Sequence, residues 1–267
     1  MSRALSRGET ATDHAGVGVR ELVPVLGAVL LLYFVVPVAV LVVTYSPAAL
    51  LTSLTEAYVL NAAVTSLAAA LLSTTIAVAF GLPLAYWLSE SSGPLVTAAL
   101  GAVVLPLVLP PVVSGMLLLT VIGPNGLGGL TELALTRSLL GVVAAQTFVA
   151  SPFFVVTAKA AFDGIDEHLE EASRSLGRNW VGTMRSVTLP LAKPGLLAGL
   201  VLTFARAMGE FGATMMLAYY PRTLPVQIWA SFISDGLDAA LPVAVVLLGV
   251  ALGTLLIVHA LRAMPWR

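Results

Sequence analysis

The chain has 267 residues, of which 58% are hydrophobic and only 10% charged, and its mean hydropathy is +0.99. Soluble domains carry roughly 25% charged residues, so this composition predicts an integral membrane protein. The formal net charge of −1 argues against nucleic-acid binding, and the absence of cysteine excludes disulfides and thiolate metal sites. The three histidines, His14, His168 and His259, are far apart in the sequence, so we expect no metal site built on them.

Six apolar stretches are long enough to cross a bilayer, which takes about 20 residues. They cover residues 23–43, 57–88, 95–119, 138–160, 190–219 and 239–262. The third stretch contains Pro106, Pro110 and Pro111, which predicts either a helix broken near a pathway or a kinked packing helix. The sequence therefore predicts an all-α, polytopic membrane protein with about six transmembrane helices.

Lysine and arginine are distributed unevenly around these spans, which predicts the orientation in the membrane. If the polar segment 161–189 faces the cytoplasm, ten of the 13 Lys and Arg residues lie inside, Arg137 and Arg222 lie outside, and Arg206 lies within a span. Both termini are then expected in the cytoplasm. The resulting organisation in the cell membrane is a tail over 1–22, one transmembrane domain over 23–262 and a tail over 263–267.

The segment from Asp163 to Pro190 is a long polar island in a hydrophobic chain. Apolar residues recur in it at helical spacing, at Ile165, Leu169, Ala172 and Leu176. Gly177 suits the left-handed conformation that ends a helix, and Asn179 suits the N-cap of a second short helix that carries Trp180. We expect two short helices at an angle, with an apolar ridge and a charged flank, that fit a socket on another protein; the alternative is a solvated loop without a partner.

Arg206 and Glu210 are charged residues inside the fifth apolar stretch. A spacing of four places them on one helical face, and a lone charge there is costly, so we expect them to pair. Two roles remain open: lining the translocation path, or bracing helices without touching the cargo. Gly195 and Gly199 on the same stretch predict close helix packing at the bundle core or at a dimer interface.

No catalytic constellation is evident in the sequence. Ser114 lacks the Gly-x-Ser-x-Gly surroundings of a nucleophile elbow, and the glycine-rich residues 123–129 lack the Gly-Lys-Ser/Thr ending of a phosphate-binding loop. Asp235 and Asp238 are expected in a capped turn before the sixth span. We therefore expect a chain that is not an enzyme and binds no cofactor or metal, so that ATP, if it drives the protein, binds to another subunit.

One motif carries a family resemblance. Glu171-Ala-Ser173, Gly177 after three residues and Val187-Thr-Leu-Pro190 after nine more resemble the signature loop of ABC importer permeases, which reads Glu-Ala-Ala, Gly and Ile-x-Leu-Pro at this spacing. Ser173 and Val187 are the two departures. Residues 81–88, 105–115, 123–128 and 204–214 are similar to segments of the molybdate/sulfate/tungstate permeases, and residues 218–221 and 235–242 look most like the archaeal molybdate/tungstate branch.

The resemblance implies an ABC type I importer permease fold in which segment 161–189, here called the coupling loop, docks on a cytoplasmic ATPase. The implied partners are an ATPase dimer that binds ATP and Mg, an extracytoplasmic oxyanion-binding protein, a second copy of this chain and the lipid bilayer. The residues expected to couple to the ATPase are Glu170, Glu171, Ala172, Ser173, Leu176, Gly177 and Trp180. The expected function is alternating-access import of molybdate or tungstate; the alternatives are a sulfate/thiosulfate permease and an ion-driven secondary transporter.

Overall fold

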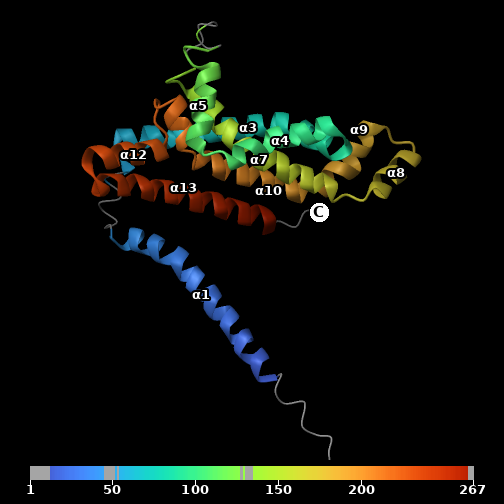
Figure 1. The fold of residues 1–267 in the computed structure, drawn as a ribbon, viewed down its shortest axis with the longest axis horizontal. Coiled ribbons are helices and arrows are strands. Elements are labelled where there is room, and N and C mark those ends of the chain that lie inside the picture. Colours follow the sequence, from blue (N-terminus) through green and yellow to red (C-terminus); the bar gives the residue numbers. More distant parts are fainter. Residues whose placement is uncertain (1–12, 45–51, 53, 127–128, 130–134, 264–267) are drawn as a thin grey trace, which may run out of the picture. The chain divides into compact units, whose positions relative to one another are not determined.

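The computed structural model describes residues 13–44, 52, 54–126, 129 and 135–263 (Figure 1). All regular structure in these ranges is helical, which confirms the all-α prediction. The chain divides into two units, Met1–Leu51 and Thr52–Arg267, which are described separately. Residues 1–12 and 264–267, which make up most of the two predicted tails, lie outside the described residues.

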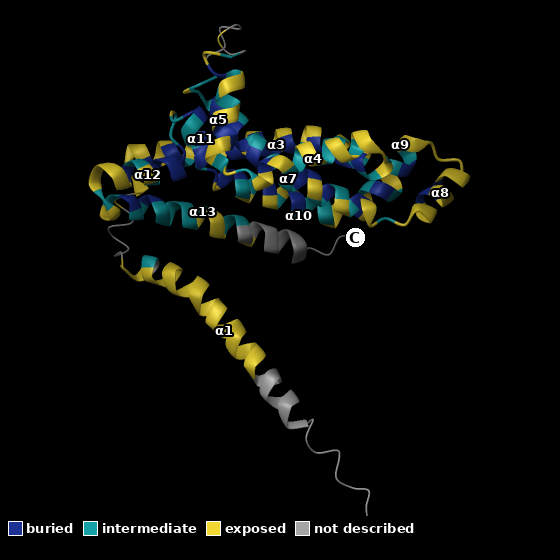
Figure 2. Ribbon diagram, in the orientation of Figure 1, coloured by how far each residue is buried: buried dark blue, intermediate teal, exposed yellow. Residues whose placement is uncertain are grey.

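The first unit contains one long helix, α1 (Asp13–Thr44), which begins within the predicted tail. Its segment Leu22–Leu41 is apolar and long enough to cross a membrane. Every side chain from residue 22 to residue 40 is exposed, as the uniform yellow of this stretch shows (Figure 2). A helix that is apolar on all sides suits lipid or other apolar helices rather than water.

The second unit is built around α7 (Leu139–Asp163), which packs between α3 (Ala57–Glu90) and α10 (Leu189–Met208). One core cluster joins these three helices, with the buried residues Ala85, Leu88, Phe154, Val155, Ala158, Phe162 and Ala192. A further long helix, α13 (Leu237–Ala263), follows α12 (Leu224–Asp235). Counting the bent pair α4–α5 as one span, up to six helices of the described residues can cross a membrane, which agrees with the prediction.

The third predicted span is broken. It consists of α4 (Pro94–Val108) and α5 (Pro111–Ile122), whose axes are bent by 119°. Pro110 and Pro111 lack backbone N–H groups and disfavour helical geometry in the residue before each of them, so the helix ends and restarts here. The interpretation as a broken helix is therefore correct, and the kinked-helix alternative is wrong.

The fifth predicted span was wrong beyond residue 208. Instead of continuing to residue 219, α10 ends at Met208 with Gly209 as its C-cap, and a short helix, α11 (Gly212–Leu217), follows. Helix α12, which lies between the fifth and sixth predicted spans, was not predicted; Pro225 in its first turn was the available signal. The predicted turn before the sixth span is shorter than expected: only Gly236, with a φ of +84°, separates α12 from α13, and Asp235 and Asp238 lie within these two helices.

Helices α5 and α11 touch through two glycines. A methyl group on Gly115 would lie 2.7 Å from the carbonyl oxygen of Ala213, and one on Gly212 would lie 2.9 Å from the backbone nitrogen of Val112. Contacts this close between backbones require the absence of a side chain. The two short helices that follow the breaks in the third and fifth predicted spans therefore pack against each other.

We predict that Gly115→Ala destabilises the protein, because the added methyl group forces α5 away from α11 at a cost of about 1–3 kcal/mol. The measurement is the thermal unfolding midpoint of the purified protein in detergent. Gly101→Ala is the matched control: nothing lies within 4 Å of the new methyl group. Since alanine favours an exposed helix interior by up to about 1 kcal/mol, this control should unfold at the same or a higher temperature. Equal midpoints for the two variants would contradict the packing argument.

Candidate coupling site

The coupling loop folds into two short helices, as predicted. Helix α8 (Glu167–Ser175) is capped by Asp166, whose Oδ1 accepts a hydrogen bond from the backbone N–H of His168 at 3.0 Å. Gly177, with a φ of +86°, follows the end of α8. Helix α9 (Trp180–Thr183) is capped by Asn179, whose Oδ1 accepts from the N–H of Gly182 at 2.8 Å. The chain then continues through a π-helical turn, η1 (Met184–Thr188), into α10.

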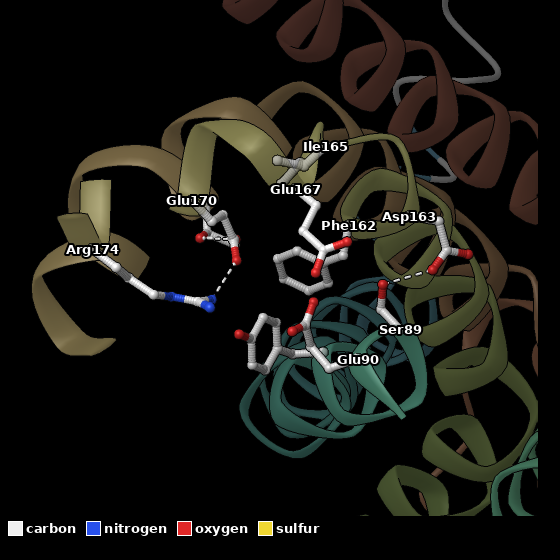
Figure 3. Close-up of a pocket in the computed structure, with 10 residues that line it drawn as sticks. Ser89, Glu90, Phe162, Asp163, Ile165, Glu167, Glu170 and Arg174 are labelled. Atoms are coloured by element: carbon white, nitrogen blue, oxygen red, sulfur yellow. Dashed lines mark hydrogen bonds and ion pairs between the residues drawn. The ribbon is translucent and has the colours of Figure 1, made fainter. Parts of the chain in front are cut away.

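Polar contacts hold α8 against η1 and α9. Glu170 is only 6% exposed; its carboxylate accepts a hydrogen bond from the Thr188 hydroxyl and pairs with Arg174 Nη2 at 2.9 Å (Figure 3). The hydroxyl groups of Ser173 and Thr183 form a hydrogen bond, with their oxygen atoms 3.1 Å apart. Breaking such buried contacts leaves polar groups without partners, so these contacts stabilise the packing of α8 against α9 and η1.

The apolar ridge of α8 points away from this buried face. Leu169 and Leu176 are 49% and 85% exposed, and Ala172 is exposed between them. Together with Trp180 and Val181 they form what we call the exposed tip. Of the predicted coupling residues, Glu171, Ala172, Leu176, Gly177 and Trp180 are exposed, whereas Glu170 and Ser173 are buried. Glu170 and Ser173 stabilise the loop from inside and are not accessible at its surface.

The coupling loop also contacts the ends of α3 and α7. The indole N–H of Trp180 donates to the Tyr86 hydroxyl at 3.3 Å, and the two rings pack edge to face with centroids 6.0 Å apart. Tyr86 packs in the same way on Phe162, at 5.4 Å. Sequence analysis missed Tyr86, because the contact joins residues 94 positions apart and Tyr86 belongs to an otherwise apolar span.

Beside these contacts, a cavity of about 320 Å³ lies between the loop and the ends of α3 and α7 (Figure 3). Its wall carries the carboxylates of Glu90, Asp163, Glu167 and Glu170 and the guanidinium of Arg174. Asp163 is held by the Ser89 hydroxyl and by Lys159 Nζ, both at 2.6 Å. No cluster of three metal-ligating side chains occurs in the described part of the chain.

Arg206 and Glu210 are paired, with Nη1 and Oε2 2.6 Å apart. They are not on one continuous helix as predicted, because α10 ends at Met208. Glu210 is 1% exposed, and its Oε1 accepts a hydrogen bond from the backbone N–H of Ala213 in α11 at 2.8 Å. The pair thus joins the end of α10 to the start of α11.

The bundle of long apolar helices, the broken third span and the polar loop at one end define a multi-pass membrane protein of the ABC importer permease fold. A bacterial alginate ABC transporter solved with an alginate-bound periplasmic protein matches with a TM-score of 0.70, over 92% of this chain and 92% of that chain, at 18% identity. The MetNI methionine ABC transporter matches with a TM-score of 0.61, over 76% and 94%, at 20% identity. At such identities the likeness establishes the fold alone.

Residues 77–264 match the family described as binding-protein-dependent transport system inner membrane component, and the chain belongs to this family. It is 64% identical to a probable molybdenum ABC transporter permease protein of Haloferax volcanii, over 92% of each chain. It is 35% identical to the molybdate/tungstate transport system permease protein WtpB of Thermococcus kodakarensis, over 88% of this chain and 92% of that one. The resemblance predicted from the sequence is confirmed.

We predict that Glu170→Ala loosens the coupling loop while Glu171→Ala does not. Loss of the buried carboxylate leaves the Thr188 hydroxyl and Arg174 without their partner, at a cost of about 1–3 kcal/mol. Glu171 is exposed, and its carboxylate lies 3.4 Å from Nδ1 of His168, which is exposed as well. Amide hydrogen exchange over residues 167–188 should become about tenfold faster in Glu170→Ala and stay unchanged in Glu171→Ala. Equal protection of these amides in the two variants would refute the proposed role of Glu170 in stabilising the loop.

We predict that Arg206→Gln destabilises the bundle by about 3–5 kcal/mol, because it leaves the Glu210 carboxylate buried without its cation. Adding Glu210→Gln removes that charge and keeps an acceptor for the Ala213 N–H. The double variant should therefore recover more than half of the lost thermal stability, measured by unfolding in detergent. If the two substitutions destabilise additively, the residues do not act as a pair.

Proposed function

We propose that the chain is the membrane subunit of an ATP-driven importer of molybdate or tungstate, and that a separate ATPase acts on it through the coupling loop. The observation that carries this proposal is the exposed tip held on a buried polar frame. Exposed apolar side chains on a rigid support are characteristic of a protein-binding surface. The cargo follows from relatives whose names specify molybdenum or molybdate/tungstate.

Movement of the tip would reach the bundle by two routes. Glu170 and Ser173 connect α8 to the segment that continues into α10. Trp180 rests on Tyr86, which belongs to α3. A partner that shifts the loop would therefore displace α3 and α10 together, and these are the helices that flank α7. Alternating access needs such a rigid connection, because a ligand shifts a conformational equilibrium only through contacts that differ between the two states.

The complete transporter in this proposal contains two copies of the chain, an ATPase dimer that binds ATP and Mg, and an extracytoplasmic binding protein that selects the oxyanion. The excess of Lys and Arg on the side of the coupling loop supports placing that loop and both termini in the cytoplasm. This chain then supplies the pathway, while the ATPase performs the hydrolysis.

Two alternatives are weaker. A sulfate permease would share the fold, but the relatives described above are named for molybdenum or for molybdate/tungstate. An ion-driven transporter needs an acidic group in the membrane that is free to bind and release the coupling ion. Glu210, the acidic residue of the fifth predicted span, is engaged by Arg206 and by the backbone of α11.

Gly177→Asp tests the docking role. Nothing lies within 4 Å of a methyl group placed at Gly177, so a side chain there meets no neighbour. Asparagine and aspartate both tolerate the left-handed conformation, but aspartate adds a negative charge at the C-terminal end of α8, where the helix dipole disfavours it. In vesicles containing the ATPase and the binding protein, Gly177→Asp should lower ATP-dependent uptake of labelled molybdate severalfold, whereas Gly177→Asn should retain most of it.

Co-purification of the ATPase with each variant shows whether docking is the step that fails. Uptake by Gly177→Asp at the wild-type rate would contradict the docking role. Competition of labelled molybdate uptake by excess tungstate or sulfate tests the cargo: the proposal predicts competition by tungstate, and competition by sulfate alone would support the sulfate alternative.

A further inference from the structure

At the end of α7 opposite the coupling loop, two arginines meet over one aromatic ring. The guanidinium carbon of Arg137 lies 5.6 Å from the centroid of the Tyr220 ring, and that of Arg222 lies 4.8 Å from the same centroid. Arg222 also lies 5.1 Å from the centroid of Tyr219. We call these four residues the distal arginine cluster. Because α7 has 25 residues, the cluster and the coupling loop are separated by roughly 37 Å of helix.

The cluster is assembled from two segments far apart in the chain. Arg137 precedes Ser138, the N-cap of α7, whose hydroxyl accepts from the N–H of Gly141 at 3.1 Å. Arg222 belongs to the connection between α11 and α12. A methyl group on Gly141 would lie 2.9 Å from Cβ of Ala218, so the start of α7 and this connection are in direct contact. The fold therefore brings the two cations together.

Arg222 is held in a defined orientation. Its Nη2 donates to the Tyr220 hydroxyl at 2.7 Å, and its Nη1 donates to Gln227 Oε1 at 3.3 Å. Gln227 is itself buried and donates from Nε2 to the Ser231 hydroxyl at 3.0 Å. The guanidinium is thus partly desolvated and pre-oriented, which lowers the entropy lost when it binds a ligand.

The positive charges of the cluster have no carboxylate partner among the described residues. The ion pairs found there join Lys159 to Asp163, His168 to Glu171, Arg174 to Glu170 and Arg206 to Glu210. Aromatic rings attract cations but do not neutralise them, so two guanidinium groups on one ring repel each other. An anion bound by both arginines would relieve this repulsion.

We propose that the distal arginine cluster binds the cargo itself: a tetrahedral, doubly charged inorganic oxyanion. Guanidinium groups match oxyanions by paired, charge-assisted hydrogen bonds, and Arg137 and Arg222 together carry the two charges required. Arg222 is only partly exposed and lies among tyrosine rings, which favours a small anion over an acidic protein surface. This inference rests on the proposed function, under which this end faces outward and is where the oxyanion arrives.

The test is direct binding of radiolabelled tungstate to the permease–ATPase complex in lipid nanodiscs, without nucleotide or binding protein. We expect Arg137→Gln and Arg222→Gln each to weaken tungstate binding about tenfold, because each removes a charge-assisted donor pair. Lys193→Gln is the matched control, since it removes one exposed positive charge near the start of α10, outside the coupling loop; it should bind tungstate like the wild type. Arg222→Lys keeps the charge without the planar fork and should give an intermediate affinity.

The proposal is overturned if the wild-type complex binds no tungstate, or if the two glutamine variants bind it as tightly as the wild type. It is also overturned if these variants keep tungstate binding but lose affinity for the binding protein, because the cluster would then be a protein-docking surface. ATP-dependent uptake by the wild-type complex is measured in parallel. If the wild-type transporter takes up tungstate but the glutamine substitutions leave tungstate binding unchanged, only this inference is refuted. If the complete wild-type transporter shows no uptake, the proposed function is refuted.

Discussion

The burial of the Glu170 carboxylate is the constraint on which the coupling loop depends. A carboxylate removed from water is tolerated only when its oxygens are bonded and its charge is paired. Thr188 and Arg174 satisfy these needs, and Thr188 ends the turn that leads into α10. Glu170 is therefore turned inward from α8, whereas Leu169 in the same helix and Leu176 at its C-cap are exposed. This arrangement leaves apolar side chains at the surface of the loop.

A second buried carboxylate is likewise paired elsewhere in the fold. Glu210 follows the end of α10, where it pairs with Arg206 and accepts a hydrogen bond from the first turn of α11. Glu170 bonds to side chains only, whereas Glu210 lies where the helical path is interrupted. Such an interruption frees backbone groups that need partners, and Glu210 Oε1 accepts a hydrogen bond from one of them, the Ala213 N–H. The closely packed glycines of α5 and α11 complete the arrangement at this interruption.

The features that could be predicted from sequence are those with local causes. Gly177 and Asn179 act within a few residues of themselves, and Pro110 and Pro111 end a helix whatever surrounds them, so the two short helices and the broken third span were predictable. The end of α10 was not, because it depends on Glu210 bonding to α11 rather than continuing a helical face with Arg206.

Contacts between distant segments were beyond sequence reasoning. Two separate contacts show this: Tyr86 with Trp180, and Arg137 with Tyr220. Each depends on how α3, α7 and the connection before α12 pack in the folded chain. The buried position of Glu170 was likewise unpredictable, since its spacing placed it on the charged flank with Glu171. Glu170 contacts Arg174 and also Thr188, eighteen residues later, whereas Glu171 pairs with the exposed His168.

The central claim is that the exposed tip of the coupling loop contacts a separate ATPase. The chain contains no cysteine, so a single Leu176→Cys substitution introduces one reactive thiol at a side chain that is 85% exposed. In the assembled transporter, a short thiol-directed cross-linker should join this residue to the ATPase, while Ile233→Cys on α12, at a position 64% exposed, should give no such product. Failure of Leu176→Cys to cross-link, or its labelling by a membrane-impermeant thiol reagent applied outside intact cells, would contradict the account.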